Sequence, residues 1–513
     1  MSIETQQYFG EGTRSLKEVL GGRRKEFLGM IRDTATKDPS YKPTLMHPEH
    51  LLSILLATNE IPPDLFSGRN AELQERIFRE NFPTIVSMLP DIVETNYKLR
   101  QAGYTHTENP LIFAADHALL ALTANDYADV LHNTYPDGNG GTNYPLKQKN
   151  PQAIIDDVTT GKFDIYTVEN HEGKIVAVFG NVRRADILGE EGYAVELGRT
   201  GTKASEVKEF EEHGINLRGV SKLRLYHLLT DPRFIADPEI KGKSAAFIYS
   251  DIRLATAWNN HYQGGKGVQG VFFGGREYGE RLEFGIASVG WRYILGRSEP
   301  MAFVFRPTFP QSYARDLVSK TLYIPDGRDA ERVHKLIRNS FGMAPIIDHN
   351  GSMIHVKPID PDNIEVALSY DRNSEGASVI FAKIDVVDTS EEFRDKAKNR
   401  IQTVSLSEAL NETGKGRAPF IEVYVDATLG NGVNAERITG VVKTLKNLGF
   451  VCNGWTPSSR DGGNSIQVSF AKLGEGAVDP IPPDMPEKYY QNGLGETRNE
   501  SLQIFQDLLD AKK

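Results

Sequence analysis

The stretch EHGINLRGVSKLRLYHLL, residues 212–229, combines a glycine turn, nearby basic residues and an apolar segment with helical spacing. If a helix begins near Gly219, the unpaired amides of its first turn and its dipole would form a phosphate site. Arg218 and Lys222 could add positive charge, and a glycine lets an anion approach the backbone. Taken alone, the turn also fits an ordinary helix start, with Ser221 as N-cap and the glycine as breaker.

The residues before this turn help to decide between a phosphate site and an ordinary helix start. A strand is predicted over AVELGRTGT, residues 194–202, and an acidic insert, KASEVKEFEEHGIN, separates it from the helix. A strand that delivers the chain to one edge of a sheet, followed by a helix start, would aim the free amides of the helix at one place. The context therefore favours phosphate binding more than the turn itself does.

Two other glycine motifs do not fit nucleotide binding. GKGVQG, residues 265–270, matches the dinucleotide fingerprint, but a helix is predicted before it and a strand after it, the reverse of the required order. DPEIKGKSA, residues 237–245, ends like a P-loop, but Asp237 stands where the first glycine is needed. The histidines form no H-E-x-x-H pattern, so no metal site is expected.

Composition limits the class of protein and its partners. The chain has 513 residues, a net charge of −10 and a pI near 5.7, without a block of consecutive basic residues, so nucleic acid is not an expected partner. The single cysteine, Cys452, excludes an intrachain disulfide and is predicted to be a small buried apolar residue. Without a signal-peptide pattern or a run of about 18 apolar residues, we expect a soluble cytoplasmic protein with no membrane partner.

Helical periodicity dominates the first part of the chain. From about residue 15 to 120, apolar residues recur at three- and four-residue spacing, which predicts an all-helical N-terminal domain. Proline lacks an amide proton and biases its predecessor away from helix, so prolines should mark the helix boundaries. The prolines expected there are Pro43, Pro48, Pro62, Pro63 and Pro110.

The pattern changes near residue 121. Two short helices are expected, TANDYADVLHNTYP and NPQAIIDDVTTG, the second with Asn150 as N-cap and Pro151 at its first position. A hairpin turning at Glu172 and Gly173 follows. Beyond the strand AVELGRTGT, further strands are predicted at SAAFIYSDIR and VQGVFFGG, with the helix LATAWNNHYQ between them. This order predicts a mixed sheet covered by helices.

A third region, from about residue 311 to 480, contains a similar order of elements. It begins with a strand and helix in TLYIPDGRDAERVHKLIRNSFG and a hairpin in NIEVALSYDRNSEGASVIFAKID. A strand, a helix and a second hairpin follow from FIEVYVDATL to SIQVSFAKL, parallel to the order of residues 245–310. A proline-rich connector leads to a final amphipathic helix, ESLQIFQDLLDA.

The element order over residues 121–274 resembles the GNAT-type N-acetyltransferase superfamily, in particular its bacterial branch that includes β-lysine acetyltransferases. The segments that carry the resemblance are YADVLHNTYP, NPQAIIDDVTTG, GKIVAVFGNV, and ELGRTGT followed by RGVSKLRLYHLL. The last pair stands where the family has its central strand and its R-x-x-G-x-G/A loop and helix, although the second small residue is displaced. The ending, IEVYVDATL to LKNLGFVCNGWTP, resembles a second GNAT-like half.

This resemblance implies an α/β (α+β) fold of tandem GNAT-like mixed sheets flanked by helices and preceded by an all-α domain. The domains would be a helical N-terminal domain at 1–120, a GNAT-like acyltransferase domain at 121–310 and a second, degenerate GNAT-like domain at 311–480. A connector and the final helix occupy 481–513. The second half is expected to be inactive because no glycine-rich turn followed by a helix stands at its equivalent place.

The resemblance also implies the co-substrate, acetyl-CoA or another acyl-CoA. Its pantetheine arm would lie along the strand 196–202, and an amide of that strand would polarise the thioester carbonyl. The residues implied for this amide are Gly198, Arg199 and Thr200. The residues implied for the pyrophosphate are Arg218, Gly219, Val220, Ser221 and Lys222.

Direct attack by an amine acceptor is the implied chemistry, and it needs a base and an acid. Glu196 is the candidate base, although a surface carboxylate explains it as well. Tyr262 is the candidate that protonates the leaving thiolate, although core packing explains it as well. Tyr135 and Asp137 are candidate contacts for a small amine or amino-acid-like acceptor, and a homodimer is among the options for the oligomeric state.

Two other functions stay open at this point. A GNAT-like chain could be a non-catalytic scaffold, with the helical N-terminal region serving association. It could also be an aminoacyl transferase that uses charged tRNA as donor, although the acidic balance argues against RNA binding, which depends largely on phosphate neutralisation.

Overall fold

The computed structural model describes most of the predicted helices and strands. The described residues are 20–37, 45, 47–58, 61–66, 70–133, 150–183, 194–235, 247–253, 285–294, 297–341, 344–349, 355–372, 379–386, 402–415, 420–428, 435–457, 465–474 and 500–512. Several predicted features lie outside these ranges. They are Pro43, Tyr135, Asp137, Tyr262 with its helix, the strand VQGVFFGG, and the motifs GKGVQG and DPEIKGKSA.

Helices form the described residues up to Gln101, as predicted, but strand β1 (Thr105–His106) lies inside the region predicted to be all-helical and pairs with the sheet. The helices are α3 (Arg24–Lys37), α4 (Pro48–Thr58), the 3₁₀ helix η1 (Pro63–Leu65) and α5 (Ala71–Gln101). Pro48 begins α4 and Pro62 is the N-cap of η1, in line with their predicted role. Pro83 and Pro90, by contrast, lie inside α5 without ending it. Packing of a buried apolar face therefore holds this helix together against the local preference of proline.

The first half of the sheet follows, with its flanking helices. Its elements are β1 (Thr105–His106), α6 (Leu111–Ala115), α7 (His117–Asn133), α8 (Pro151–Thr159), β2 (Phe163–Glu169), β3 (Ile175–Arg183), β4 (Ala194–Thr202), α9 (Ala204–Glu212), α10 (Arg218–Thr230), α11 (Pro232–Ile235), β5 (Phe247–Arg253), β6 (Gly285–Ile294) and β7 (Arg297–Pro307). The predicted cap of α8 is confirmed, because the Asn150 side chain accepts a bond from the Gln152 amide at 2.9 Å. The β2–β3 hairpin is confirmed as well, with Gly173 at a φ of 73° in its turn.

The second half contains the remaining strands. Its elements are α14 (Pro310–Ser319), β8 (Thr321–Tyr323), α15 (Gly327–Phe341), β9 (Ile346–Asp348), η5 (Pro361–Asn363), β10 (Glu365–Arg372), β11 (Val379–Val386), β12 (Gln402–Ser405), α17 (Leu406–Lys415), β13 (Phe420–Asp426), α18 (Ala435–Asn447), β14 (Val451–Pro457), β15 (Ile466–Leu473) and α20 (Glu500–Lys512). Cys452 is buried in β14, as predicted. Helix α14, strand β12 and helix α17 are elements that the sequence patterns did not indicate.

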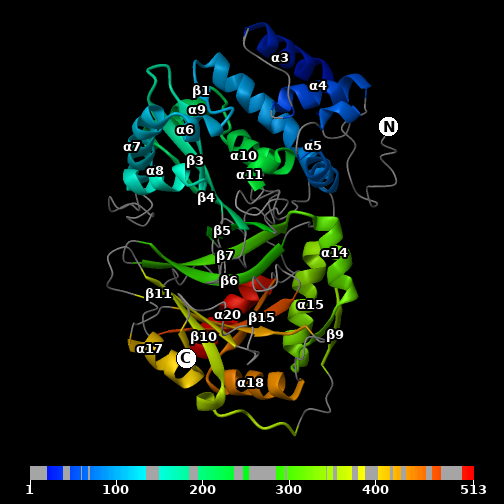
Figure 1. Ribbon diagram of the computed structural model, residues 1–513, viewed down its shortest axis with the longest axis vertical. Coiled ribbons are helices and arrows are strands. Elements are labelled where there is room, and N and C mark those ends of the chain that lie inside the picture. Colours follow the sequence, from blue (N-terminus) through cyan, green and yellow to red (C-terminus); the bar gives the residue numbers. More distant parts are fainter. Residues whose placement is uncertain are drawn as a thin grey trace.

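Thirteen of these strands form one sheet in the order β1-β2-β3-β4-β5-β7-β6-β14-β15-β13-β11-β10-β12. Within each half, four strand pairings recur: an antiparallel pair, a parallel pair, and two more antiparallel pairs. The halves meet where Ser288 of β6 pairs with Gly454 of β14. Figure 1 shows helices α5, α10 and α11 on one side of β4 and helices α7 and α8 on the other. The predicted fold class, mixed sheets flanked by helices and preceded by helices, is confirmed.

Helix α5 joins the N-terminal helices to both halves. The Glu80 carboxylate of α5 caps α14, accepting bonds from the amides of Gln311 at 2.9 Å and Ser312 at 3.0 Å. The Asn81 side chain donates to the Thr308 carbonyl at 2.8 Å and accepts a bond from the fully buried Arg306 of β7. These contacts make the N-terminal helices part of the same body as the sheet.

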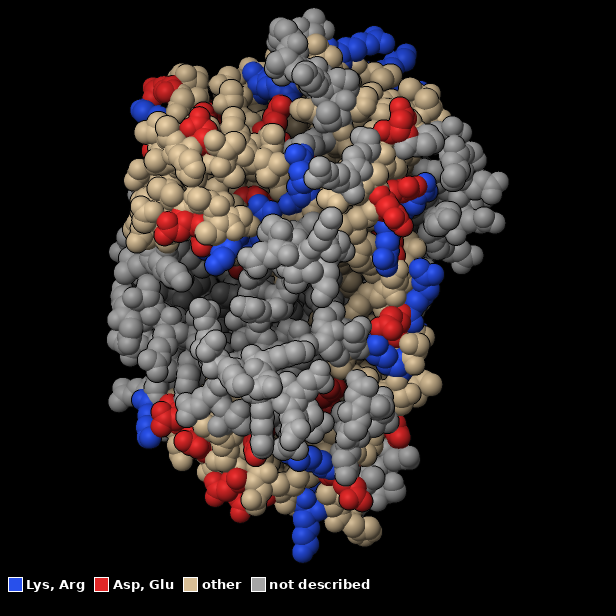
Figure 2. All heavy atoms as spheres, viewed as in Figure 1, with Lys and Arg blue, Asp and Glu red and all other residues tan. Residues whose placement is uncertain are grey.

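The predicted domain boundary between residues 120 and 121 falls inside helix α7, which runs from His117 to Asn133. The sheet has already begun before this point, because β1 (Thr105–His106) pairs with β2. The boundaries at 310 and 480 stay predictions. On the face shown in Figure 2, the described basic and acidic side chains lie interspersed. Within the described ranges, no helix is long and apolar enough to span a bilayer.

Candidate functional site

The central feature of the first half is the way in which its two parallel strands separate. Strands β4 and β5 pair at Ala194–Phe247, Val195–Ile248 and Glu196–Tyr249. Beyond this point β4 continues to Thr202 paired with β3, while β5 continues to Arg253 paired with β7. The two parallel strands therefore separate after Glu196. A separation of this kind in a sheet is a place where an extended ligand can bind.

A bulge interrupts β4 just after the strands separate. Val178 of β3 pairs with Gly201 and Gly180 pairs with Gly198, so Arg199 and Thr200 together stand opposite one residue of β3. Arg199 has a φ of 48°, a left-handed conformation that is unusual for a residue other than glycine. Bulges re-aim the groups around them and are frequent beside active sites. The predicted residues Gly198, Arg199 and Thr200 thus all lie at this bulge.

Glu196, the predicted base, stands at the last paired position before the opening. It is directly opposite Val182 of β3, and paired residues share one face of a sheet. Val182 is opposite Phe163, which packs with α7 and α8, so Glu196 lies on the face that these two helices cover. A Cβ atom built on Gly198 would lie 2.7 Å from Oε1 of Glu196, which places the carboxylate over the bulge.

The predicted phosphate turn is packed against α5. A Cβ atom on Gly219 would lie 2.6 Å from the Asp91 carbonyl and closer still to Thr95. The Lys222 side chain is fully buried and forms an ion pair with Asp91. The reason predicted for the glycine, close approach of an anion, is therefore corrected: Gly219 permits close approach of a helix, and Lys222 neutralises a carboxylate of that helix.

The first turn of α10 keeps part of the predicted cradle. The N-cap is Leu217, so the interpretation of Ser221 as N-cap is wrong. The Gly219 amide donates to Asn216 at 3.2 Å and the Ser221 amide to Leu217 at 3.1 Å. The amides of Arg218 and Val220 are the other donors of this turn, and the positive end of the α10 dipole lies here. The acidic insert forms helix α9, with Glu206 in its first turn, which disfavours a phosphate at that helix start.

Two side chains that the sequence analysis did not single out hold the bulge. Tyr127 of α7 donates its hydroxyl proton to the Arg199 carbonyl. Arg224 of α10 donates to the carbonyls of Gly180 at 2.8 Å and Gly198 at 3.3 Å and to the Thr200 hydroxyl at 3.1 Å. The sequence could have indicated Arg224, because it is a basic residue within the apolar run after Gly219, and a buried basic side chain needs a partner.

Several titratable side chains lie on the face of the sheet that packs against α10, away from α7 and α8. Tyr166 and Nδ1 of His227 share a hydrogen bond of 3.1 Å. Burial raises the pKa of the Asp164 carboxyl to about 7, although its ion pair with Arg183 at 2.7 Å opposes the shift. Burial lowers the pKa of the His106 imidazole to about 3. Among the described residues, no group of His, Cys, Asp and Glu side chains could hold a metal ion.

Comparison with known proteins gives limited similarity. No protein-family model and no curated protein matches the chain. Among solved structures, a chimera of the Vibrio cholerae spermidine N-acetyltransferase SpeG and hSSAT is similar at 12% identity and a TM-score of 0.23, covering 40% of this chain and 96% of the other. The Vibrio cholerae spermidine N-acetyltransferase in complex with CoA and spermine is similar at 11% identity and a TM-score of 0.22, with the same coverage. At these values the likeness does not bear on the site.

Proposed function

We propose that the chain is an acyl-CoA-dependent N-acyltransferase of the GNAT type, with acetyl-CoA as donor and a small amine as acceptor. The observation that carries the proposal is the separation of β4 and β5 after three paired positions, with a bulge directly beyond it. In this proposal the extended pantetheine arm lies along β4 where that strand has separated from β5. The sequence resemblance over residues 121–274 supports the same assignment.

In this proposal the residues around the opening bind the pantetheine arm and the pyrophosphate of acyl-CoA. The pantetheine arm would add to β4 between Leu197 and Thr202, as an extended ligand adds to a strand edge. The pyrophosphate would lie at the start of α10, near the amides of Arg218 and Val220. The amides of Gly219 and Ser221 are bonded within the turn, so the cradle is smaller than the sequence predicts.

The proposed reaction is direct acyl transfer. The amine nitrogen forms a bond to the thioester carbonyl carbon, the carbon–sulfur bond breaks, and the sulfur leaves with the electron pair. Glu196 accepts the proton that the amine loses, and the thiolate is protonated to give CoA. An amide of the bulge stabilises the charge on the carbonyl oxygen. Tyr262 as proton donor, and Tyr135 and Asp137 as acceptor contacts, stay proposals because they lie outside the described residues.

The test begins with binding of acetyl-CoA, CoA and charged tRNA to the purified full chain by calorimetry. Thiol release from acetyl-CoA is then measured with a panel of small amines and amino acids. We expect acetyl-CoA to bind and at least one amine to be acylated. Failure to bind either CoA species would overturn the proposal, in favour of a tRNA-dependent transferase if charged tRNA binds and of a scaffold if nothing does.

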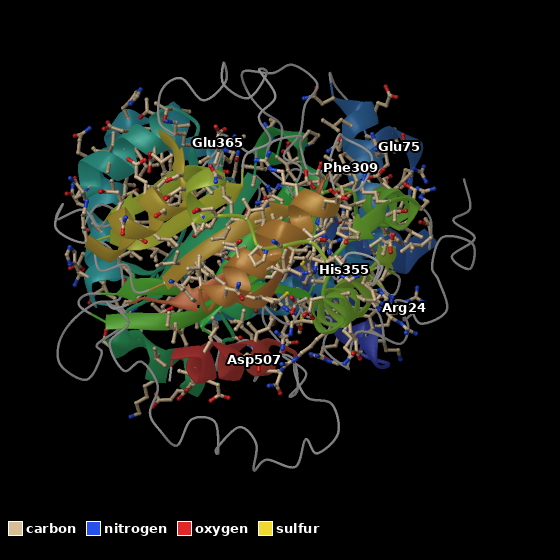
Figure 3. The ribbon with its side chains drawn as sticks, turned by 90° about the horizontal axis from the view of Figure 1, so that it is seen from below. Arg24, Glu75, Phe309, His355, Glu365 and Asp507 are labelled. Carbon is tan, nitrogen blue, oxygen red and sulfur yellow. The ribbon has the colours of Figure 1, made fainter. Side chains whose placement is uncertain are left out.

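Glu196→Gln separates chemistry from binding. We expect acyl transfer to fall by about 100-fold or more, because the amine loses its base, while the Kd of acetyl-CoA changes little. Glu365→Gln is the matched control, a carboxylate on strand β10 of the second half, labelled in Figure 3. Equal activity of Glu196→Gln and Glu365→Gln would exclude Glu196 as the base.

A further inference from the structure

The β4 bulge has an unfavourable backbone that other groups must hold in place. Arg199 adopts a φ of 48° although it carries a side chain. Residues in this region persist where the surrounding structure fixes them, and such residues cluster at functional sites. The contacts of the bulge therefore show which residues keep it in this conformation.

One set of contacts comes from the face that α7 and α8 cover. The hydroxyl of the fully buried Tyr127 bonds the Arg199 carbonyl. The Arg199 guanidinium lies 4.5 Å from the centre of the Phe163 ring and 2.9 Å from the Asp157 carboxylate of α8. Because its side chain is tied to this face while Tyr127 fixes its carbonyl, Arg199 has little freedom to leave the left-handed conformation.

The second set of contacts comes from the opposite face. Arg224 of α10 is 3% exposed and donates to the carbonyls of Gly180 and Gly198 and to the hydroxyls of Thr200 and Ser221. Each of these acceptors is a neutral oxygen. The bonds therefore hold the guanidinium against the bulge, and none of these four bonds is made to a carboxylate. A positive charge in such a buried position acts over a longer range than it would in water.

We propose that Tyr127 and Arg224 are positioning residues that hold the β4 bulge from its two faces. They bond the carbonyls of Gly198 and Arg199 and so fix the backbone on which the proposed amide donor stands. This inference rests on the proposed function. When the amine nitrogen attacks and the carbon–sulfur bond breaks, negative charge on the carbonyl oxygen meets fixed donors with a buried cation behind them.

The test compares Tyr127→Phe and Arg224→Lys with Tyr166→Phe in the full chain. Tyr166 is a suitable control because it is another fully buried tyrosine of the first half whose hydroxyl is bonded, here to His227. We measure kcat and KM, the Kd of CoA, and the carbonyl stretching frequency of bound acetyl-CoA labelled at the thioester carbon. We also measure amide hydrogen exchange over residues 197–202.

For Tyr127→Phe we expect kcat to fall about 10-fold or more, with the Kd of CoA within about 2-fold, and a smaller downward shift of the carbonyl frequency. Arg224→Lys keeps the charge but loses the multiple bonds, and we expect the same direction of change. Amide exchange over 197–202 should be faster in both variants than in Tyr166→Phe. The proposal is overturned if neither exchange nor carbonyl frequency differs from that control.

The exchange measurement keeps this inference separate from the proposed function. If the wild type binds no CoA, the proposed function fails, yet exchange over 197–202 still reports whether Tyr127 and Arg224 hold the bulge. If CoA binds and amines are acylated but the variants match the control, the function stands and the inference fails.

Discussion

The two halves of the sheet use the same strand pairings, but their parallel pairs end differently. In the first half β4 runs on to Thr202 after its last pairing with β5, at Glu196. In the second half β11 pairs with β13 from Ala382 to Asp385 and ends at Val386. In the first half β4 thus continues well beyond its parallel partner, whereas the described part of β11 stops one residue after its last pair with β13.

The helices that follow these strands differ as well. From β4 the chain passes through α9 directly to the start of α10. The next described element after β11 is β12, which pairs with β10 at the far edge of the sheet, and α17 begins directly after β12. The Ser405 hydroxyl caps α17 by accepting a bond from the Glu408 amide at 3.1 Å. A shared strand order therefore does not make a shared site; among the described residues, the extension of β4 beyond β5 and the start of α10 distinguish the first half.

The largest effect should come from filling the close contact between α10 and α5 at Gly219. In Gly219→Ala the new methyl group meets the Asp91 carbonyl and Thr95, and backbone cannot move aside. Overpacking costs up to about 3 kcal/mol, and the better helix propensity of alanine returns about 1 kcal/mol. We expect a net loss of about 2 kcal/mol in the free energy of unfolding, measured with guanidinium chloride, and weaker acetyl-CoA binding.

Gly440→Ala in α18 is the matched change in the second half. Its methyl group would meet side-chain atoms of Ile359, Cγ1 at 2.6 Å and Cδ1 at 2.9 Å, which can shift, while the nearest backbone atom, the Lys357 carbonyl oxygen, is at 3.3 Å. The free energy of unfolding should change by less than about 1 kcal/mol, with acetyl-CoA binding unaltered. Equal losses in both variants would mean that α10 is not held more tightly than α18.

A smaller effect is expected from the polar cluster of the second half. Glu422 of β13 is 2% exposed, and its Oε1 accepts bonds from Asn453 at 2.9 Å and Ser469 at 2.5 Å. Glu422→Gln weakens these charge-assisted bonds and should lower the free energy of unfolding by about 1.5 kcal/mol. Acyl transfer should be unchanged. A folded variant with lost activity would contradict the view that only the first half carries the reaction.

Much of the fold could be predicted from local sequence signals. The cap at Asn150 and the turn at Gly173 depend on residues within a few positions, and both are confirmed. The inside of α5 could not be predicted in this way, because Pro83 and Pro90 are kept helical by packing that involves distant parts of the chain. Strand β12 was missed for a similar reason. It pairs with β10, which precedes β11 in the chain, and not with its neighbour in sequence.

The candidate site shows the same division. The family resemblance implied a role for the segment Gly198 to Thr200, which stays a prediction, whereas the bulge found there depends on pairing with β3. The glycine at 219 was noticed for its local freedom, whereas its neighbours Asp91 and Thr95 come from a helix more than a hundred residues earlier in the chain. Contacts between distant segments decide which of two local interpretations holds.

Within the first half, a half-buried imidazole and a buried carboxyl give opposite responses to pH. His106 has its pKa lowered by burial from 6.5 to about 3, so its contribution to stability is lost as the pH falls from about 6.5. Asp164 has its pKa raised from 3.8 to about 7, so its contribution is lost as the pH rises over a similar range. Each group changes the free energy of unfolding by at most about 1.4 kcal/mol per pH unit, and in the wild type the two changes partly cancel.

His106→Gln removes the contribution of the imidazole to the pH dependence of stability and leaves that of Asp164. The stability of the wild type relative to this variant should increase with pH between about 3 and 6.5, by up to about 1.4 kcal/mol per unit, and stay constant above that range. Guanidinium unfolding at pH 4.5, 6.0 and 7.5 measures the difference. A constant difference would show that the imidazole of His106 is not held neutral by burial on β1, and that the acid response of the first half has another source.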